Sequence, residues 1–393
     1  MKSLITASLV TVFLVAACGK TNEQVTTDTP QVDAGGMLAT LVDEYFERNL
    51  EMNPLRATFI GDYRYNDRMA NSNGPEYRAA AEAMDTEFLA RLSEIDRDQL
   101  EYQDQLSYDL FKIERELSIE GDKFPSHLQP VNQFYSVTNS FVQLGSGSGA
   151  HPFKTVKDYD DFLSRADDYS VIIDQIITNM KLGMQQGVTQ PRILMQKLEP
   201  QIDAQIVADA KDSNFFKPVL NFPEGFSEED RVRLTSAYRE KIDATIIPAY
   251  QRISNFLGDE YTSAARETVG LYAQPNGTDW YAYMVRLRTT TDLTPDEIHQ
   301  IGLSEVARIH EEMQAVMAEV GFDGSLDEFF EFVNTDDQFF YDDAEELIQG
   351  YRDMSGHISE LTKKLFDIMP NTRFEVRRVE PFREASSSSG SYQ

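Results

Sequence analysis

Apolar residues recur every three or four positions through most of this 393-residue chain, a spacing typical of helices with one buried face. In the first run, Leu38, Leu41 and Tyr45 share one side of a predicted helix that ends at Asn53-Pro54. We expect further helices over 75–119 with a break near 96–100, from 155, over 192–210, from 227 with a kink or shortening at Pro248, over 294–320, from 325, and over 343–369. The pattern predicts an all-α fold of mostly long antiparallel helices.

Helix-capping signals support these boundaries. The clearest is Thr294-Pro295-Asp296-Glu297, in which the Thr294 hydroxyl can accept from the amide of Glu297 and the Glu297 carboxylate can accept from the amide of Thr294. Pro295 falls at the first helical position, where its missing N–H costs nothing. Comparable starts are Thr155 with Asp158 and Ser325 with Glu328, and a fitting stop is Gly321.

One segment alternates as a strand would. Phe374 and Val376 fall on one side of residues 373–380, and polar residues fall on the other. We therefore expect at most one or two short strands, near 373–380, in an otherwise helical chain.

The amino terminus has the layout of a secretory signal. A basic start at Lys2 precedes a mostly apolar run that is too short to span a bilayer. The run ends in Val15-Ala16-Ala17-Cys18, which resembles the bacterial lipobox, and Cys18 is the only cysteine. We expect cleavage after residue 17 and lipidation of Cys18. An ordinary signal peptide followed by an unrelated cysteine is the alternative.

The predicted mature protein consists of a flexible tether over 18–36 and a helical domain over 37–393. Removing residues 1–17 takes away one charged residue, Lys2, and leaves 35 basic and 66 acidic residues, a formal charge of −31. Such a charge opposes binding to nucleic acid and to anionic lipid. Attachment to the membrane is therefore expected through the lipid on Cys18. Gly19 follows where inner-membrane lipoproteins usually carry Asp, so the resemblance implies the periplasmic face of the outer membrane.

His310-Glu311-Glu312-Met313-Gln314 is the nearest approach to a metal motif. In a zinc peptidase helix a second histidine stands four residues after the first, but Gln314 occupies that position here. A neutral amide is a poor zinc ligand, which favours an exposed helix face. The remaining histidines are His127, His151, His299 and His357. None pairs at ligand spacing, although a ligand set drawn from distant segments stays open.

Other candidate groups favour structural roles. The acidic pairs Asp160-Asp161, Asp336-Asp337 and Asp342-Asp343 could bind calcium or act as acid and base, but in so acidic a chain they are typical of a solvated face. The run Trp280-Tyr281-Ala282-Tyr283 could line a sugar or peptide cleft, yet core packing is the favoured interpretation. Once acylated, Cys18 cannot be a nucleophile. The sequence thus predicts no catalytic, cofactor-binding or metal-binding residue.

Several segments together resemble one bacterial family, catalogued as domain of unknown function 885. The most specific is Gly270-Leu271-Tyr272-Ala273-Gln274-Pro275-Asn276-Gly277. The others are 281–287, 288–299 with Gly302-Leu303, Asn53-Pro54 to Gly61-Asp62, His151-Pro152-Phe153 with Asp158-Tyr159, and Gln190-Pro191-Arg192. Members of the family are often long helical lipoproteins.

The resemblance implies zinc metallopeptidase relatives that carry a His-Glu-Ala-x-Pro-Gly-His-His segment downstream of the region similar to 377–384. That segment is absent here, so the chain resembles the amino-terminal half only, and zinc is expected only in full-length relatives. We expect an envelope lipoprotein that forms cleft walls for a peptide substrate and is inactive without a missing carboxyl-terminal half.

A non-catalytic lipoprotein that binds a peptide or scaffolds a partner is the alternative. The two hypotheses predict different surfaces. A completed helical core would favour the alternative, whereas an exposed apolar face near the carboxyl end would favour a missing half.

Overall fold

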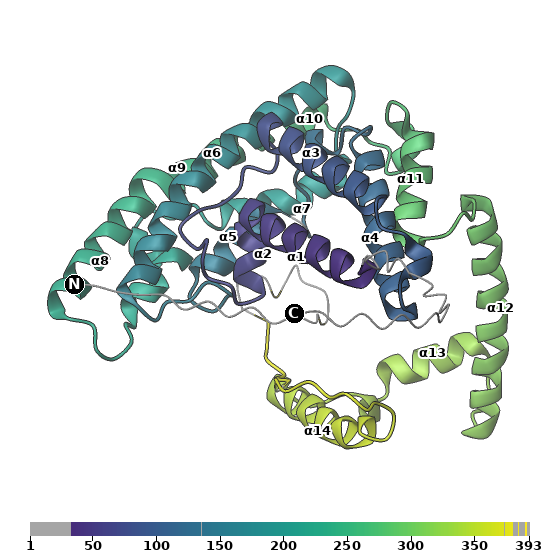
Figure 1. Ribbon diagram of the computed structural model, residues 1–393. Coiled ribbons are helices and arrows are strands. Elements are labelled where there is room, and N and C mark those ends of the chain that lie inside the picture. The colour runs from purple at the N-terminus through teal and green to yellow at the C-terminus, as the bar shows by residue number, and fades with distance from the viewer. Residues whose placement is uncertain (1–32, 135, 373, 380–383, 385–389, 391–393) are drawn as a thin grey trace, which may run out of the picture.

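The computed structural model describes residues 33–134, 136–372, 374–379, 384 and 390. Within these residues the fold is all-α, without a β-strand. The helices up to α11 form a wedge-shaped body, and α12–α14 project from it (Figure 1). Cys18, the signal sequence and nearly all of the predicted tether lie outside the described residues. No helix in the described part is long and apolar enough to cross a membrane. The α-helices are α1 (Ala34–Met52), α2 (Pro54–Phe59), α3 (Pro75–Leu92), α4 (Tyr102–Gly121), α5 (Val137–Gly145), α6 (Val156–Gln186), α7 (Arg192–Asp203), α8 (Glu228–Lys241), α9 (Ile247–Phe256), α10 (Thr262–Ala264), α11 (Gly277–Thr289), α12 (Pro295–Glu319), α13 (Leu326–Thr335) and α14 (Ala344–Thr362).

The main core of the body forms around α6. Its buried face packs against α5, α7, α8 and α9, and aromatic rings fill the centre. The rings of Phe141 and Tyr169 stack with centroids 4.0 Å apart, and Phe162 lies 5.3 Å from Phe141. Each of these side chains is fully buried, and burying one such ring contributes about 1.5–3 kcal/mol.

Two smaller cores flank the main one. In the first, α1, α3 and α4 enclose Leu38, Phe88 and Phe111. In the second, Trp280 and Tyr283 of α11 stack on Phe124, with ring centroids 6.0 and 5.1 Å away. The core-packing interpretation of the Trp280–Tyr283 run is confirmed for these two rings.

The helix that begins at Glu228 neither ends nor shortens at Pro248. It continues to Ala264 through two π-helical segments, Ile242–Ile246 and Leu257–Tyr261. In the first segment the amide of Ile247 donates to the carbonyl of Ile242, five residues back. This wider turn comes directly before the proline, which has no N–H to donate, so the chain accommodates Pro248 without a break.

The predicted caps are confirmed. Capping boxes start α6 at Thr155 with Asp158, α12 at Thr294 with Glu297, and α13 at Ser325 with Glu328. Gly321 follows α12 in the left-handed region, with φ at +69°. Each of these boundaries depends on local chemistry, which the sequence contains in full.

Other boundaries differ from the prediction. The first helix begins at Ala34 rather than near Met37, because the Asp33 carboxylate accepts from the amide of Gly36 and caps the helix. The first turn of α1 therefore includes residues that were predicted to belong to the tether. The helix from Arg192 ends at Asp203, and α14 ends at Thr362 rather than at residue 369.

The strand predicted near 373–380 is wrong for its described residues, 374–379, which are irregular. A strand needs a neighbouring chain to satisfy its amides and carbonyls. No extended partner lies beside this segment within the described residues, where the one β-bridge joins Pro191 and Arg266. Alternating side chains were therefore not sufficient to form a strand here.

Candidate functional site

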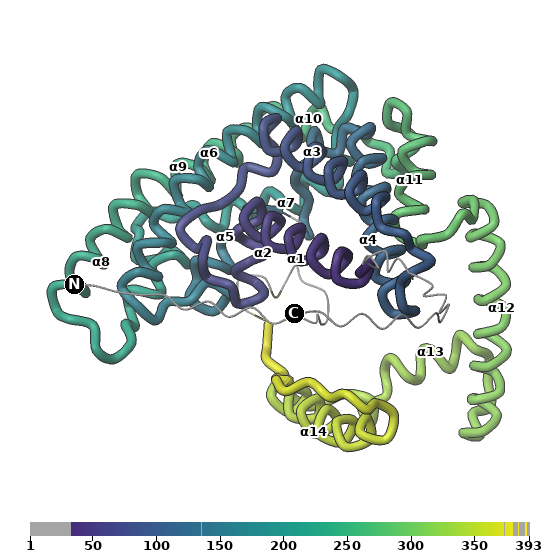
Figure 2. The backbone as a smooth tube through the Cα atoms, viewed as in Figure 1, coloured from purple at the N-terminus to yellow at the C-terminus, as the bar shows by residue number. Residues whose placement is uncertain are grey.

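The strongest candidate site is the projecting segment from residue 294 to 372, which we call the arm. The chain leaves the body after α11 and then runs through α12, α13, the 3-10 turn Asp337–Phe339 and α14 (Figures 1 and 2). In the described chain after Tyr283, Met317 is the only buried side chain. The arm is therefore helical without having a core of its own.

An apolar stripe runs along α14. Its members follow each other at spacings of four and three residues, so they lie on one face of the helix. Each of these residues has between 41 and 57% of its surface exposed to solvent. The stripe consists of Leu347, Tyr351, Met354, Ile358 and Leu361. A face of this kind normally packs against another element, and here about half of each residue's surface is left exposed.

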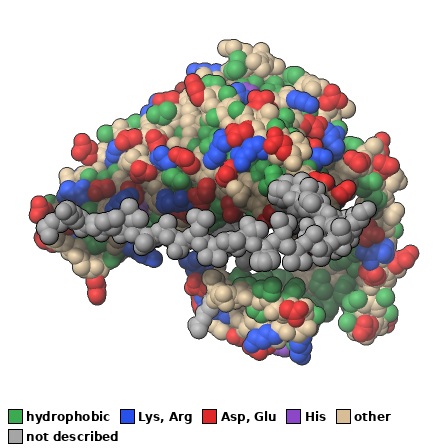
Figure 3. Space-filling view, viewed as in Figure 1, with side chains coloured by type: hydrophobic (Ala, Val, Ile, Leu, Met, Phe, Trp, Pro, Cys, Tyr) green, Lys and Arg blue, Asp and Glu red, His purple; other side chains and the backbone are tan. Residues whose placement is uncertain are grey.

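Further apolar side chains extend the surface onto α12 and α13. Those exposed on α12 are Ile301, Leu303, Val306, Ile309 and Val316. On and beside α13, the rings of Phe322, Phe329, Phe332 and Phe339 contact one another with centroids 5.1–6.3 Å apart. Figure 3 shows hydrophobic side chains gathered in the recess beside these helices. The apolar surface is thus shared by the helices of the arm.

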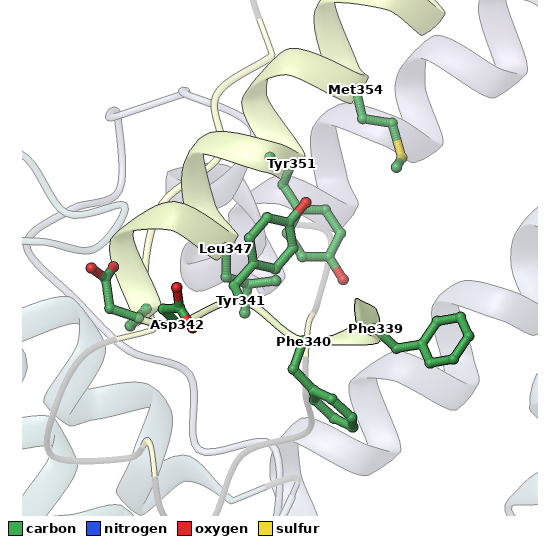
Figure 4. A pocket seen from close by; sticks show the side chains of 10 residues that line it. Phe339, Phe340, Tyr341, Asp342, Leu347, Tyr351 and Met354 are labelled. Carbon is green, nitrogen blue, oxygen red and sulfur yellow. The ribbon is translucent and has the colours of Figure 1, made fainter. Parts of the chain in front are cut away.

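An open aromatic hollow of about 620 Å³ lies at the start of α14. Tyr341, Leu347, Tyr351 and Met354 line it together with Phe339 and Phe340 (Figure 4). The Tyr341 hydroxyl lies so close to Gly350 that a Cβ there would collide with it. Gly350 therefore allows the Tyr341 ring to lie against the helix and form one side of the hollow.

The arm that carries this apolar surface is strongly acidic. The arm has nineteen Asp and Glu against four Lys and Arg, a formal charge of −15 within a chain of −30. Three of the four cations are already paired inside the arm: Arg308 with Glu305 and Glu312, Arg352 with Glu345, and Lys363 with Glu360. The arm thus combines exposed apolar side chains with a large negative charge.

The metal-like segment 310–314 lies on α12 within the arm. His310 and Gln314 are exposed, and Glu312 forms an ion pair with Arg308. His299 and His357 are likewise exposed on the arm. Among the described residues no three His, Cys, Asp or Glu side chains are grouped so that they could hold a metal ion. The side chains described here do not fit a zinc site.

The acidic pairs serve the helices that carry them. Asp160 is bound by Arg233 at 2.8 Å and Asp161 by Lys157 at 2.6 Å. The carboxylates of Asp336 and Asp343 accept from backbone amides at helix starts. The partners of these four carboxylates are arginine, lysine and backbone amides, an arrangement that stabilises helices.

A buried arginine and histidine pair was missed by reasoning from the sequence. Arg165 of α6 donates to Nδ1 of His151 at 2.9 Å, and Nε2 of His151 lies 2.9 Å from the carbonyl of Asp158. Because a guanidinium can only donate, the His151 ring is neutral and carries its proton on Nε2. Burial lowers the pKa of His151 to about 4 and that of Arg165 to about 10.

The same guanidinium joins distant parts of the body. It donates to the Thr58 hydroxyl at 2.6 Å and to the carbonyls of Tyr65 and Arg68 at 3.3 and 3.2 Å. Arg165 therefore fixes the segment after α2 onto α6. Nothing in its local sequence distinguishes it from a surface arginine, because Thr58, Tyr65 and Arg68 lie 97 to 107 residues away in the sequence.

A largely buried ion pair lies among α1, α3 and α4. Asp85 and Arg115 approach to 2.9 Å, and the Tyr45 hydroxyl donates to Asp85 at 3.0 Å. The guanidinium of Arg115 lies 4.2 Å from the centroid of the Tyr45 ring. Burial raises the pKa of Tyr45 to about 12. With Phe88 and Phe111 packed against Tyr45, this cluster is closed and serves the packing of the three helices.

Comparison with known proteins places the chain in a family and a fold. The sequence profile described as "Bacterial protein of unknown function (DUF885)" matches residues 54–393. A solved structure described as "the putative lipoprotein from Colwellia psychrerythraea" superposes with a TM-score of 0.79 at 21% identity. The match covers 92% of this chain and 65% of the other, so the chain spans less than two thirds of that protein's length. None of the curated proteins matches the sequence.

Proposed function

This chain belongs to the bacterial protein family of unknown function DUF885, and we propose that it is the lipid-anchored, amino-terminal helical part of a zinc-dependent envelope peptidase. The chain supplies walls of a peptide-binding cleft. The metal site belongs to further polypeptide that packs on the arm, and the described residues do not fit it. The chain by itself is inactive.

The uncovered apolar surface of the arm carries this proposal. A helical stripe such as Leu347, Tyr351 and Met354 normally packs against another element, because most of the stability of a helix in a protein comes from burying its apolar face. Contiguous apolar side chains that are left exposed in this way are typical of interaction sites. The greater length of the Colwellia psychrerythraea protein, of which this chain covers 65%, supports further polypeptide as the covering element.

Attachment to the envelope is proposed through lipid on Cys18, after cleavage of residues 1–17. The same neighbour is described as a lipoprotein, which supports an anchor, and the residue after the lipidated cysteine supports the periplasmic face of the outer membrane. The net charge of −30 supports the absence of nucleic acid among the partners.

The test is to purify the mature chain, measure bound zinc, and assay hydrolysis of unstructured peptides. We expect neither stoichiometric zinc nor hydrolysis. The DNA downstream of codon 393 should then be read in all frames for a His-Glu-Ala-x-Pro-Gly-His-His segment, and its product co-expressed. Zinc at one equivalent with hydrolysis by the chain alone would overturn the proposal.

A non-catalytic peptide-binding or scaffolding lipoprotein is the second candidate, and the open aromatic hollow on α14 favours it. It predicts that a peptide raises the Tm of the chain while no zinc-site polypeptide restores hydrolysis. The first candidate predicts hydrolysis upon co-expression.

A further inference from the structure

We propose that the arm binds a polypeptide surface with an apolar centre and a basic rim, and does not bind a second copy of this chain. The proposal deepens the proposed function and rests on it only in taking polypeptide as the material that covers the arm. The side chains exposed on the arm indicate which chemical groups that polypeptide presents.

The apolar centre follows from the stripe and the hollow. Tyr351 and Met354 are 54 and 57% exposed and project on one side of α14, with the ring of Tyr341 beside them (Figure 4). Tyrosine and methionine are common at protein interfaces because both bury a large area, and methionine adapts its shape to its partner. A partner must therefore present apolar side chains to this hollow.

The basic rim follows from the charge of the arm. Its nineteen carboxylates greatly outnumber its four cations, and three of those cations are paired within the arm. On α14, Glu346 and Asp353 lie seven residues apart along one edge of the stripe, and Arg352 at the other edge is paired with Glu345. A partner that covers the stripe brings its own rim next to these carboxylates, where lysine and arginine are attracted and acidic residues are repelled.

The same charge argues against other occupants. Two copies would place two surfaces of −15 face to face, because the arm carries that charge in each chain. Anionic lipid would meet the same repulsion. A basic, amphipathic polypeptide is the occupant for which both the apolar contact and the charge are favourable.

The experiment uses the mature chain and two synthetic helical peptides with the same leucine face, one with lysine and one with glutamate on the polar face. Fluorescence anisotropy of the labelled peptides measures affinity at two ionic strengths, about 0.01 M and about 1 M, where the Debye length falls from about 30 to about 3 Å. At low salt we expect the leucine–lysine peptide to bind at least about tenfold more tightly than the leucine–glutamate peptide. At high salt this difference in affinity between the two peptides should shrink.

A matched pair of variants locates the binding. Tyr351→Ser with Met354→Ser should weaken binding of the leucine–lysine peptide about tenfold or more. The control, Val171→Ser with Val232→Ser, alters body side chains that are 60 and 62% exposed and should leave the affinity unchanged. Circular dichroism establishes that both variants keep their helix content.

Equal binding of the two peptides would overturn the proposal. An affinity for the leucine–lysine peptide that is unchanged in the Tyr351→Ser, Met354→Ser variant would overturn it too. So would a dimer in sedimentation that the arm variant abolishes, or preferential binding of the arm to phosphatidylcholine vesicles. None of these results depends on zinc or hydrolysis, so this proposal and the proposed function can fail separately.

Discussion

Arg165 donates to Nδ1 of His151 across 2.9 Å, and neither side chain is more than 2% exposed. The contact requires a neutral imidazole, because a protonated ring would place two positive groups in hydrogen-bond contact. Protonation of His151 therefore destabilises the folded state.

The stability of the body should fall as the pH is lowered from 7 to 5. The pKa of His151 is about 4 in the fold against 6.5 for an unperturbed histidine, so the unfolded chain binds more protons between these values. The stabilisation is complete above about pH 6.5 and is lost progressively toward pH 4. Urea unfolding should show that this histidine accounts for a loss of about 2 kcal/mol between pH 7 and pH 5.

His151→Gln isolates that contribution. Glutamine can accept from Arg165 but does not titrate, so the difference between wild type and variant should shrink by about 2 kcal/mol from pH 7 to pH 5. A difference that stays constant over this range would contradict a neutral, buried His151.

Replacing Arg165 should be among the most damaging single changes in the body. Arg165→Met keeps an apolar stem but leaves His151, the Thr58 hydroxyl and two carbonyls without their donor. Each buried unsatisfied group costs about 1–3 kcal/mol, and a total loss of about 3–5 kcal/mol is expected in chemical denaturation.

The matched control is Arg233→Met, which removes an exposed ion pair with Asp160. Its cost should stay below about 1 kcal/mol. Similar losses in the two variants would show that Arg165 is an ordinary surface arginine.

Among the described helices, those of the arm should be the first to be cut by a protease. Met317 is its only buried side chain, and segments with few buried contacts open locally at low free energy. Limited proteolysis followed by mass spectrometry should give early cuts within 290–372 and leave the body intact. Early cuts within α6 at a comparable rate would show that the arm is no less stable than the body.

Removing the cap of α12 should loosen the arm alone. In Thr294→Ala the amide of Glu297 loses its acceptor, at a cost of about 1 kcal/mol to the helix. Amide hydrogen exchange should quicken over the first turns of α12 and stay unchanged in α6. Ser304→Ala, in the middle of the same helix, is the control and should not quicken exchange there, since its hydroxyl bonds only the carbonyl of Gln300.

The sequence predicted the fold well where the causes are local. The caps at Thr155, Thr294 and Ser325 need residues only three positions away, and all three starts were correct. The strand near 373–380 failed because a strand depends on a partner elsewhere in the chain. Asp33 was missed as a cap because Gly35 and Gly36 read as a flexible tether.

The candidate site was predicted less well, for a physical reason. The stripe from Leu347 to Leu361 looks the same in sequence whether another element covers it or not, so periodicity identified the helix and not its exposure. The predicted alternatives of a completed core or an exposed face could be separated only by coordinates. The contacts of Arg165 are likewise formed only by the fold.

The π-helical segment Ile242–Ile246, between α8 and α9, explains a regular spacing in this part of the chain. Tyr238, Ile242, Ile246 and Tyr250 follow one another at intervals of four, and all are buried. In a regular α-helix a step of four residues overshoots a full turn by about 40°, so three steps would turn the last side chain well away from the core. The wide turn absorbs one surplus residue and returns the helix to phase. The register of this helix against α6 therefore depends on the number of residues in the π turn as much as on their chemistry.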